Sequence, residues 1–228
     1  MQGWPVQFLF SDDAGKQSLK LKGEEYKYLF KVRRHETGDT LYFRTRAKSE
    51  ELHKYQVISL DGRSAVLELT STELKEVRAD KELHIAWCVI DPKSVEKVLP
   101  SLNEIGVSRI SFIYCARSQK NFKTDLQRYE RILETSSQQC GRSKPIAFEV
   151  YKTLDAFLQL HPETVVLDFC DEVLACENEV KTVLIGCEGG FSEDERQKVE
   201  RLKRFRLDTP MILRSESAAM AIAAKVLI

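Results

Sequence analysis

A glycine-rich turn near the C-terminus is the part of the sequence best suited to binding a ligand. The stretch VLIGCEGGFSEDE, residues 183–195, is an apolar run that ends in a glycine turn and leads into a helix start. Gly186, Gly189 and Gly190 let the backbone turn tightly and come close to a bound molecule. A glutamate, Glu188, stands among these glycines. The alternative is a strand-to-helix turn that only packs.

The residues of this turn disfavour a phosphate ligand. The turn lacks the GxGxxG spacing of dinucleotide loops and has no Lys-Ser or Lys-Thr pair to meet phosphates and magnesium. A buried carboxylate at Glu188 would also repel a pyrophosphate. S-adenosylmethionine (SAM) suits the turn better, because it is a phosphate-free nucleoside that carries an ammonium and a sulfonium. The pattern therefore favours a ligand of the SAM type.

A second candidate stretch is LRSESAAMAIAAKVLI, residues 213–228, which follows FRLDT and Pro210. Arg214 precedes Ser215 and Glu216, so a helix would begin here with a hydroxyl cap and an acidic first turn. The stretch predicts an irregular loop that passes into a helix and presents Arg214 at the junction. By itself it is equally typical of a well-capped terminal helix.

The elements that must position these stretches alternate between strands and helices. Buried-type apolar strands are predicted at residues 83–90, 109–114, 164–169 and 182–187, and another strand end at residues 205–209. Helices are predicted at about 93–103, 124–139, 192–203 and 214–228. Such alternation predicts an α/β fold with a parallel sheet covered on both faces. Ligands of these sheets bind at the carboxyl ends of the strands, where VLIGCEGG would lie. Ser192 and Glu195 have the spacing of a capping box.

The first seventy residues or so have a different pattern. Short β-branched or aromatic runs at residues 6–10, 39–45, 53–60 and 64–70 are separated by turn signals, and one helical segment covers residues 23–34. These features predict a small β-barrel or sandwich with one helix. A charged connector at residues 71–82 marks the change of pattern. We therefore expect two domains, at residues 1–72 and 73–228.

Composition excludes several classes of protein. With 228 residues, 43% hydrophobic and 31% charged, the chain is neither disordered nor membranous, and it has no signal peptide or spanning run. The six cysteines and four histidines are scattered without a CxxC motif or a Cys/His cluster, so we expect no metal site. A cytoplasmic protein with reduced thiols is the expectation, without a membrane partner.

The net charge is zero, yet the charges are segregated along the chain. Basic residues outnumber acidic ones at residues 16–54 and 117–144, whereas acidic residues dominate 168–195. Such segregation is typical of a protein that binds a polyanion at one place and a cation at another. Solvated faces of different charge are the plainer interpretation.

Several motifs in order along the chain resemble the SPOUT methyltransferases, in particular the RsmE type, which methylates N3 of a uridine in bacterial small-subunit ribosomal RNA. The family patterns IGPEGGFSxxE and LRxETA appear here as IGCEGGFSEDE and LRSESA, and HLxxVLRxxxGD appears as YLFKVRRHETGD. The family's ELGV is EIGV at residues 104–107, followed by Arg117-Ser118 and by QCGR at residues 139–142. The departures are Tyr28 for histidine, Cys187 for proline, Ser217 for threonine, and Asp208-Thr209 for Leu-Gly.

The resemblance implies a PUA-like β-barrel that binds RNA, in front of an α/β domain whose C-terminal part forms a deep trefoil knot. It further implies a homodimer with SAM bound in the knot loops, and ribosomal RNA, within the small subunit, as the partner. The implied cofactor-binding residues are Ile185, Gly186, Glu188, Gly189, Gly190, Leu207, Ile212, Leu213 and Glu216.

The expected catalytic residues are Arg214, to stabilise negative charge on the uracil, and Glu188, to fix the loop or the cofactor. The uridine must be splayed out of folded RNA, which needs phosphate contacts elsewhere. Arg33, Arg34, Arg117 and Arg142 are the candidates for these contacts.

Two other functions remain open at this stage. The chain could be a catalytically inactive RNA-binding module of the same fold, because Cys187 and Asp208-Thr209 depart from the family loops. A nicotinamide- or nucleotide-dependent Rossmann enzyme is the second alternative, although Glu188 and the late position of the glycine turn disfavour it.

Overall fold

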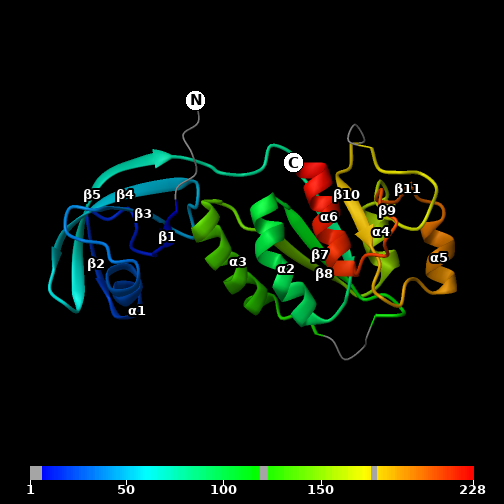
Figure 1. Ribbon diagram of the computed structural model, residues 1–228, viewed down its shortest axis with the longest axis horizontal. Helices are drawn as coiled ribbons and strands as arrows, with labels where there is room; N and C mark the ends of the chain where they lie inside the picture. Colours follow the sequence, from blue (N-terminus) through cyan, green and yellow to red (C-terminus); the bar gives the residue numbers. More distant parts are fainter. Residues whose placement is uncertain (1–6, 119–122, 176–178) are drawn as a thin grey trace. The chain divides into compact units, whose positions relative to one another are not determined.

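A computed structural model describes residues 7–118, 123–175 and 179–228 of the chain, and it divides into two compact units (Figure 1). The first unit comprises the chain up to Arg78 together with Ser137–Lys144, and the second comprises the remainder. Residues 137–144 belong to the first unit through backbone hydrogen bonds such as Phe8 N–H to Gln138 O at 3.1 Å. Two residues considered in the sequence, Val6 and Cys176, lie outside the described residues.

The first unit is built on a five-stranded sheet with the order β1-β3-β4-β5-β2. Its strands are β1 (Leu9–Phe10), β2 (Ser18–Lys22), β3 (Thr40–Arg44), β4 (Glu51–Leu60) and β5 (Ser64–Leu74). Only β1 and β3 are parallel neighbours, and the other pairs are antiparallel. Register shifts bend the long β4–β5 hairpin, as bulges do in curved sheets. Because β5 continues to Leu74, the strand passes the boundary predicted at residue 72.

The helical segment predicted at residues 23–34 is shorter than expected and irregular. One α-helical turn, α1 (Gly23–Tyr26), continues as the π-helix η1 (Lys27–Val32). Buried Tyr26, Leu29 and Phe30 hold this segment to the core of the first unit. Arg34 follows with a left-handed backbone, φ 60°, which ends the helix.

The second unit is a parallel sheet with helices, as the alternating pattern predicts. The six strands have the order β11-β9-β10-β6-β7-β8, and all their pairings are parallel. The strands are β6 (His84–Cys88), β7 (Arg109–Ile113), β8 (Ala147–Tyr151), β9 (Val165–Leu167), β10 (Thr182–Ile185) and β11 (Arg204–Phe205). The predicted α/β class is confirmed. Sequence reasoning missed β2, β8 and the helix α4 (Leu154–Leu160).

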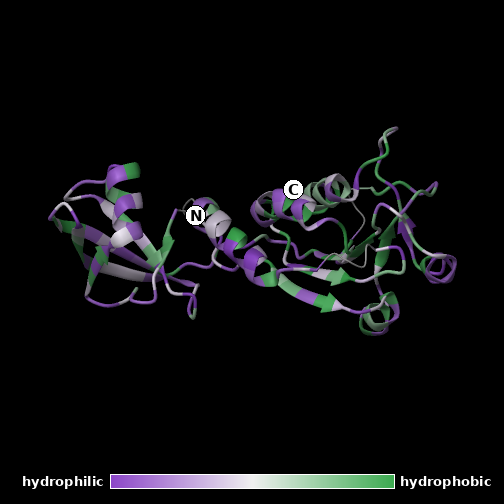
Figure 2. Ribbon diagram, turned by 90° about the horizontal axis from the view of Figure 1, so that it is seen from below, coloured by the Kyte–Doolittle hydropathy of each residue, from purple (hydrophilic) through white to green (hydrophobic). Residues whose placement is uncertain are grey.

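The other helices of this part of the chain are α2 (Pro92–Ile105), α3 (Leu126–Cys140), α5 (Glu193–Val199) and α6 (Ser215–Leu227). Helices α2 and α6 lie side by side (Figure 1). The helices of this unit carry both purple and green residues in Figure 2, as expected for helices with one buried face. At the end of α2, Gly106 has φ 112°, and a Cβ there would lie 2.6 Å from Ala79 Cβ, so only glycine fits. Within the described ranges, no helix is both long and apolar enough to cross a membrane.

Candidate functional site

A cavity of about 430 Å³ lies in the second unit at the carboxyl ends of β9 and β10. Ligands of α/β sheets bind at the carboxyl ends of the strands, and this cavity lies on the β10 side of the point between β6 and β10 where the chain order reverses. The predicted site residues that line this cavity are Ile185, Gly186, Glu188, Gly190, Leu207, Ile212, Leu213 and Arg214. The fold therefore brings together two stretches that the sequence places about twenty residues apart.

The glycine turn is held from both ends by hydrogen bonds. Gly190 N–H donates to Cys187 O at 2.9 Å, and Gly190 has φ 65°, a conformation that favours glycine. At the other end, Gly186 O accepts a hydrogen bond from Ser215 Oγ at 2.7 Å. Trp87 Nε1 donates to the same hydroxyl at 2.8 Å. Ser215 thus ties the first residue of α6 to the glycine turn. The predicted hydroxyl cap is wrong, because the N-cap residue is Arg214 and no side-chain hydrogen bond caps the helix.

Cys187 occupies the position where the resembling family has proline. Its thiol is buried and lies 3.5 Å from Gly190 O, to which it donates a weak hydrogen bond. Burial raises the pKa of this thiol, so it stays protonated near neutral pH and can donate. The hydrogen bond between the Cys187 thiol and Gly190 O therefore restrains the turn at the position where the family has a proline ring.

Glu195 fixes the start of α5 beside the pocket. Its carboxylate accepts from Ser192 N–H at 2.9 Å, and Glu195 N–H donates to Ser192 Oγ at 3.3 Å. The predicted capping box is confirmed. The second carboxylate oxygen accepts from Ala116 N–H at 2.8 Å, which joins the loop after β7 to the same corner.

Glu188 is exposed and lines the cavity, whereas the sequence pattern suggested a buried carboxylate. The repulsion expected for a pyrophosphate assumed a buried carboxylate. A charge in contact with water is strongly screened, so that repulsion is smaller than the sequence argument requires. The absence of a phosphate-binding motif remains the stronger reason to disfavour a dinucleotide.

The cavity also holds an ionic cluster that the sequence did not indicate. The Asp168 side chain is 6% exposed, and its carboxylate pairs with Arg196 Nη1 at 2.5 Å and with Arg204 Nη1 at 3.5 Å. Arg196 also lies over the ring of Phe191, 5.4 Å from its centroid. Asp168 directly follows β9, Arg196 is in α5 and Arg204 is in β11, so these pairings join three elements beside the cavity.

Arg214 lines the cavity, and its charged side chain can bind a ligand. It is the N-cap residue of α6, its side chain is exposed, and it lines the cavity. No hydrogen bond or ion pair joins its guanidinium to another residue in the described part of the chain. A guanidinium carries five donors, so Arg214 can bind a negatively charged or carbonyl group that enters the cavity.

Gly189 and Glu216, two predicted cofactor-binding residues, are not part of the cavity wall. Gly189 is instead in contact with Arg117, whose Nη1 donates to Gly189 O at 3.0 Å. A Cβ at Gly189 would lie 3.2 Å from Arg117 Cβ, so any other residue would require Arg117 to shift by a few tenths of an ångström. Glu216 lies in the first turn of α6, where a carboxylate is favourable to the helix dipole.

Comparison with known proteins assigns this arrangement to a family. Residues 77–227 match the model of the RNA methyltransferase domain. A ribosomal RNA small subunit methyltransferase E from Helicobacter pylori strain 26695 is 37% identical over 222 residues, covering 96% of this chain and 98% of the relative. The chain belongs to this RNA methyltransferase family. The corresponding protein of H. pylori strain J99 is 36% identical over the same length.

Solved structures of RNA methyltransferases share the fold. The methyltransferase E from Neisseria gonorrhoeae, bound to S-adenosyl methionine, has a TM-score of 0.74 at 16% identity and covers 97% of this chain and 96% of its own. A Legionella pneumophila protein with bound SAM has a TM-score of 0.75 at 20% identity, with coverage of 96% and 94%. At such identities, these structures show the α/β fold of the family.

The arginines predicted to contact RNA occupy three different environments in this family member. Arg33 and Arg34 are exposed in the first unit, and Arg33 donates to Tyr28 OH at 3.1 and 2.9 Å. Arg117 is exposed and engaged with the glycine turn. Arg142 is 8% exposed and its Nε donates to Lys144 O at 2.6 Å, while burial lowers its pKa to about 10. A structural role suits Arg142 better than contact with RNA.

Proposed function

We propose that this protein transfers a methyl group from SAM to N3 of a uridine in small-subunit ribosomal RNA. The observation that carries the proposal is the unpaired Arg214 at the cavity formed by the glycine turn and the loop before α6. Family membership supports RNA methylation, and the names of the H. pylori relatives support ribosomal RNA of the small subunit.

The cavity suits SAM in size and chemistry. Its volume of about 430 Å³ falls in the range of small-molecule sites. Backbone groups of the glycine turn can meet a ribose, apolar Ile185 and Leu213 can pack against an adenine, and Glu188 offers a carboxylate to a cationic group. The bound SAM reported for the Legionella and Neisseria proteins supports the assignment. When bound, this cofactor supplies an electrophilic methyl group.

Arg214 would serve the acceptor base. Uridine N3 carries a proton and is a poor nucleophile until that proton is lost, so the site must favour the deprotonated uracil. The negative charge then spreads onto the carbonyl oxygens that flank N3. The guanidinium of Arg214 can donate to such an oxygen and stabilise this charge without losing its own proton.

The proposal includes an architecture in which the first unit is a PUA-like RNA-binding domain and the loops around the cavity form a trefoil knot. We also propose a cytoplasmic homodimer. Phe169, Met211 and Ile212 are 79%, 65% and 83% exposed at the cavity, and a second copy of the chain would cover such apolar side chains. Light scattering on the purified protein tests the dimer.

The RNA would be held by cations outside the cavity. Arg33 stacks over the ring of Tyr28, with its guanidinium carbon 5.4 Å from the centroid. Tyr28 is 37% exposed, so an unpaired base can approach the ring while the arginine meets a phosphate. This pair supports Arg33 and the neighbouring Arg34 as RNA contacts.

Replacement of Arg214 tests the proposed chemistry. Arg214→Ala should lower the rate of methyl transfer to ribosomal subunits by at least about a hundredfold, the usual effect of removing one charge-stabilising donor. Binding of SAM, measured by calorimetry, should change little. The matched control is Arg201→Ala, because Arg201 is an exposed arginine of the same unit outside the cavity wall.

Two outcomes would contradict the proposal. Full activity of Arg214→Ala would remove Arg214 from the chemistry. Failure of the unaltered protein to bind SAM at micromolar concentrations would favour a catalytically inactive RNA-binding module of the same fold. Mass mapping of modified uridines in ribosomal RNA, from cells with and without the gene, identifies the methylated position.

A further inference from the structure

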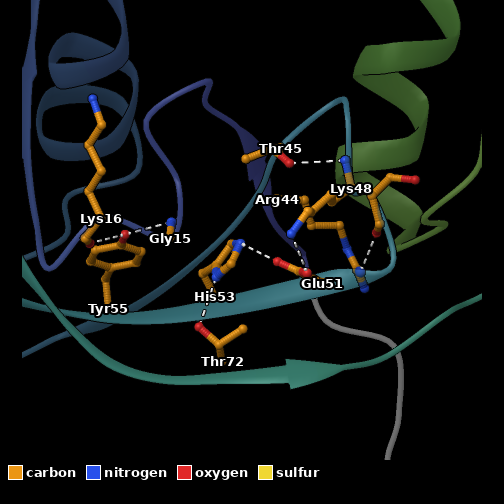
Figure 3. Close-up of polar contacts among 10 residues, drawn as sticks. Gly15, Lys16, Arg44, Thr45, Lys48, Glu51, His53, Tyr55 and Thr72 are labelled. Carbon is orange, nitrogen blue, oxygen red and sulfur yellow. Dashed lines mark hydrogen bonds and ion pairs between the residues drawn. The ribbon is translucent and has the colours of Figure 1, made fainter.

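The first unit contains a second cavity, of about 710 Å³, which the proposed methyl transfer does not use. It lies between the loop that joins β1 to β2 and the loop that joins β3 to β4, and β4 and β5 form its floor (Figure 3). The residues that matter for its chemistry are Gly15, Lys16, Arg46, Lys48, Glu51 and His53. The volume is sufficient for one nucleotide.

His53 lines this cavity and carries a buried nitrogen without a hydrogen-bond partner among the described residues. The His53 side chain is only 4% exposed, and Nδ1 is 2.9 Å from Thr72 Oγ1. Nε2 has no hydrogen-bond partner among the described residues, and the nearest charged atom, Glu51 Oε2, is 3.8 Å away. A buried polar atom without a partner costs about 1–3 kcal/mol, so a ligand that reaches Nε2 gains by pairing with it.

Two hydrogen bonds to Tyr55 hold the loop beside His53. Gly15 N–H donates to Tyr55 OH at 3.0 Å, and the same hydroxyl donates to Lys16 O at 2.6 Å (Figure 3). Gly15 has φ 93°, and a Cβ there would lie 3.2 Å from His53 Cε1. The backbone can therefore pass this close to the imidazole only because residue 15 is glycine. Such preorganisation lowers the entropic cost of binding.

Cations surround the opening of the cavity. Lys16, Arg46 and Lys48 are 67%, 53% and 64% exposed, and each pairs with an acidic side chain of the surface. Exposed pairs of this kind contribute at most about 1 kcal/mol, so a phosphate can draw these cations away from their partners. The rim thus supplies mobile positive charge.

A buried cation lies behind the same loop. Arg44 is fully buried, with Nη1 donating to Ser49 O at 2.6 Å (Figure 3). Its Nε and Nη2 have no hydrogen-bond partner among the described residues. Burial is the main cause that lowers the pKa of His53, and the charges of Arg44 and Lys48 lower it further against the opposing effect of Glu51. The neutral form of the His53 ring is therefore favoured, and Asp12 and Glu51 are the acidic side chains that line the same cavity.

We propose that this cavity binds one nucleotide of the RNA substrate, away from the methylated uridine, with its phosphate at Lys16, Arg46 and Lys48 and its ribose 2′-hydroxyl at His53 Nε2. A hydroxyl can donate and accept, so it satisfies Nε2 whichever ring nitrogen of His53 carries the proton. The 2′-hydroxyl also distinguishes RNA from DNA. The choice of RNA as the ligand rests on the proposed function.

The test measures binding of the full-length protein to a single-stranded, uridine-containing RNA and to DNA of the same sequence, by fluorescence anisotropy at several salt concentrations. Lys48→Glu should weaken binding of both by about three- to tenfold and reduce the salt slope of log K by about one. The matched control is Lys181→Glu, since Lys181 is an exposed, ion-paired lysine at the start of β10, outside both cavities. This control should bind both like the unaltered protein.

His53→Leu keeps a side chain of similar bulk and removes both nitrogens. It should weaken RNA binding and leave DNA binding nearly unchanged, so the preference for RNA should fall several-fold. Unchanged RNA binding by both variants would overturn the nucleotide site, and an equal loss for RNA and DNA in His53→Leu would overturn the ribose contact. If His53→Leu does not fold, Lys48→Glu decides the nucleotide site, and His53→Phe, which keeps a planar ring and also removes both nitrogens, replaces it in the RNA-to-DNA comparison.

Binding of SAM and methyl transfer to ribosomal subunits are measured for the same proteins. If the unaltered protein binds SAM and methylates RNA while Lys48→Glu binds RNA normally, only the nucleotide site is wrong. If the unaltered protein shows no transfer while Lys48→Glu weakens RNA binding, the nucleotide site stands and the proposed function is wrong.

Discussion

Glu188 and Arg214 lie at the same cavity and carry opposite charges, both in contact with water. The exposed arginine has no partner in the described part of the chain, so it can serve the acceptor base. The exposed glutamate is screened, so it can attract a cationic cofactor only modestly. The two side chains are therefore expected to differ in importance, with Arg214 affecting the rate and Glu188 the affinity.

Replacement of Glu188 by glutamine measures that modest attraction. Glu188→Gln should weaken SAM binding by about two- to fivefold, which corresponds to an exposed ion pair. Calorimetric titration with S-adenosylhomocysteine, which has no sulfonium, is the comparison. If Glu188 interacts with the sulfonium, the variant loses affinity for SAM more than for this product, whose sulfur is uncharged. A loss of a hundredfold or more would mean that Glu188 becomes buried when the cofactor binds.

At the level of single residues, the sequence motifs identified the residues that line the cavity better than the residues that hold its walls in place. The glycine turn and Leu213-Arg214 were recognisable because glycine spacing and a helix start leave a local pattern. Asp168 and Ser215 have no such pattern, because their roles depend on contacts with residues distant in sequence. Their positions near strand and helix ends were the only available signal.

The helix α5 is only a short element, yet its first turn joins two loops of the candidate active site. The capping box of Ser192 and Glu195 begins this helix, and the Glu195 carboxylate also accepts from Ala116 N–H. Sequence patterns predicted the box because its spacing is local. They predicted the wrong end of the helix, which stops at Val199 rather than near Lys203.

Substitutions in this capping box should separate the cap of α5 from the contact between Glu195 and Ala116 N–H. Ser192→Ala removes one cap and should lower the free energy of unfolding by about 1 kcal/mol. Glu195→Ala should lower it further, because it also leaves Ala116 N–H without its partner. Urea denaturation followed by circular dichroism measures both. Glu193→Ala is the control, since Glu193 is in the same turn and exposed; an equal loss there would show that helix charge, not capping, is responsible.

Strand recognition depended on how apolar each strand is. The runs that became β6 and β10 are buried along their whole length, so periodicity and β-branched residues revealed them. Strand β2 alternates lysine and serine with two leucines, and β8 is largely half-exposed, so both had weaker signals. The π-helix η1 also followed no sequence rule, because its geometry depends on packing in the first unit.

The stability of the whole molecule should depend on pH through a histidine outside both cavities. His84 Nε2 is 2.7 Å from Ser111 Oγ, and Phe157, His161, Arg109 and Glu149 are its other neighbours. Burial is the main cause that lowers the pKa of His84 to about 4, and the charges of His161 and Arg109 contribute. The folded protein therefore holds this ring neutral where the unfolded chain would protonate it.

The sign of the effect follows from that difference. Between pH 6.5 and about 4 the unfolded chain binds more protons, so stability falls as the pH falls, by up to about 3 kcal/mol from this group. Urea unfolding at pH 7, 6, 5 and 4 measures the decline. His84→Gln cannot titrate, so the decline should be smaller in that variant. Parallel declines in both proteins would assign acid sensitivity to other groups.

The division into two units was only partly predictable. A change of pattern near residues 71–82 indicated two domains, but the compact units divide after Arg78. No local pattern could place residues 137–144 in the first unit, because that assignment rests on hydrogen bonds to residues more than sixty positions away. Val77, for example, exchanges hydrogen bonds with Ser143 at 3.0 and 3.1 Å.

The assignment of residues 137–144 to the first unit has a consequence for protein synthesis. The first unit cannot be completed when its own strands leave the ribosome, because the backbone N–H groups of Phe8 and Phe10 donate to oxygens of Gln138, which is made much later. At roughly 5–20 residues per second, the wait after Arg78 lasts several seconds. During translation, the N-terminal sheet must therefore form before the hydrogen-bond partners of Phe8 and Phe10 exist. These hydrogen bonds can form only after α3 has been made.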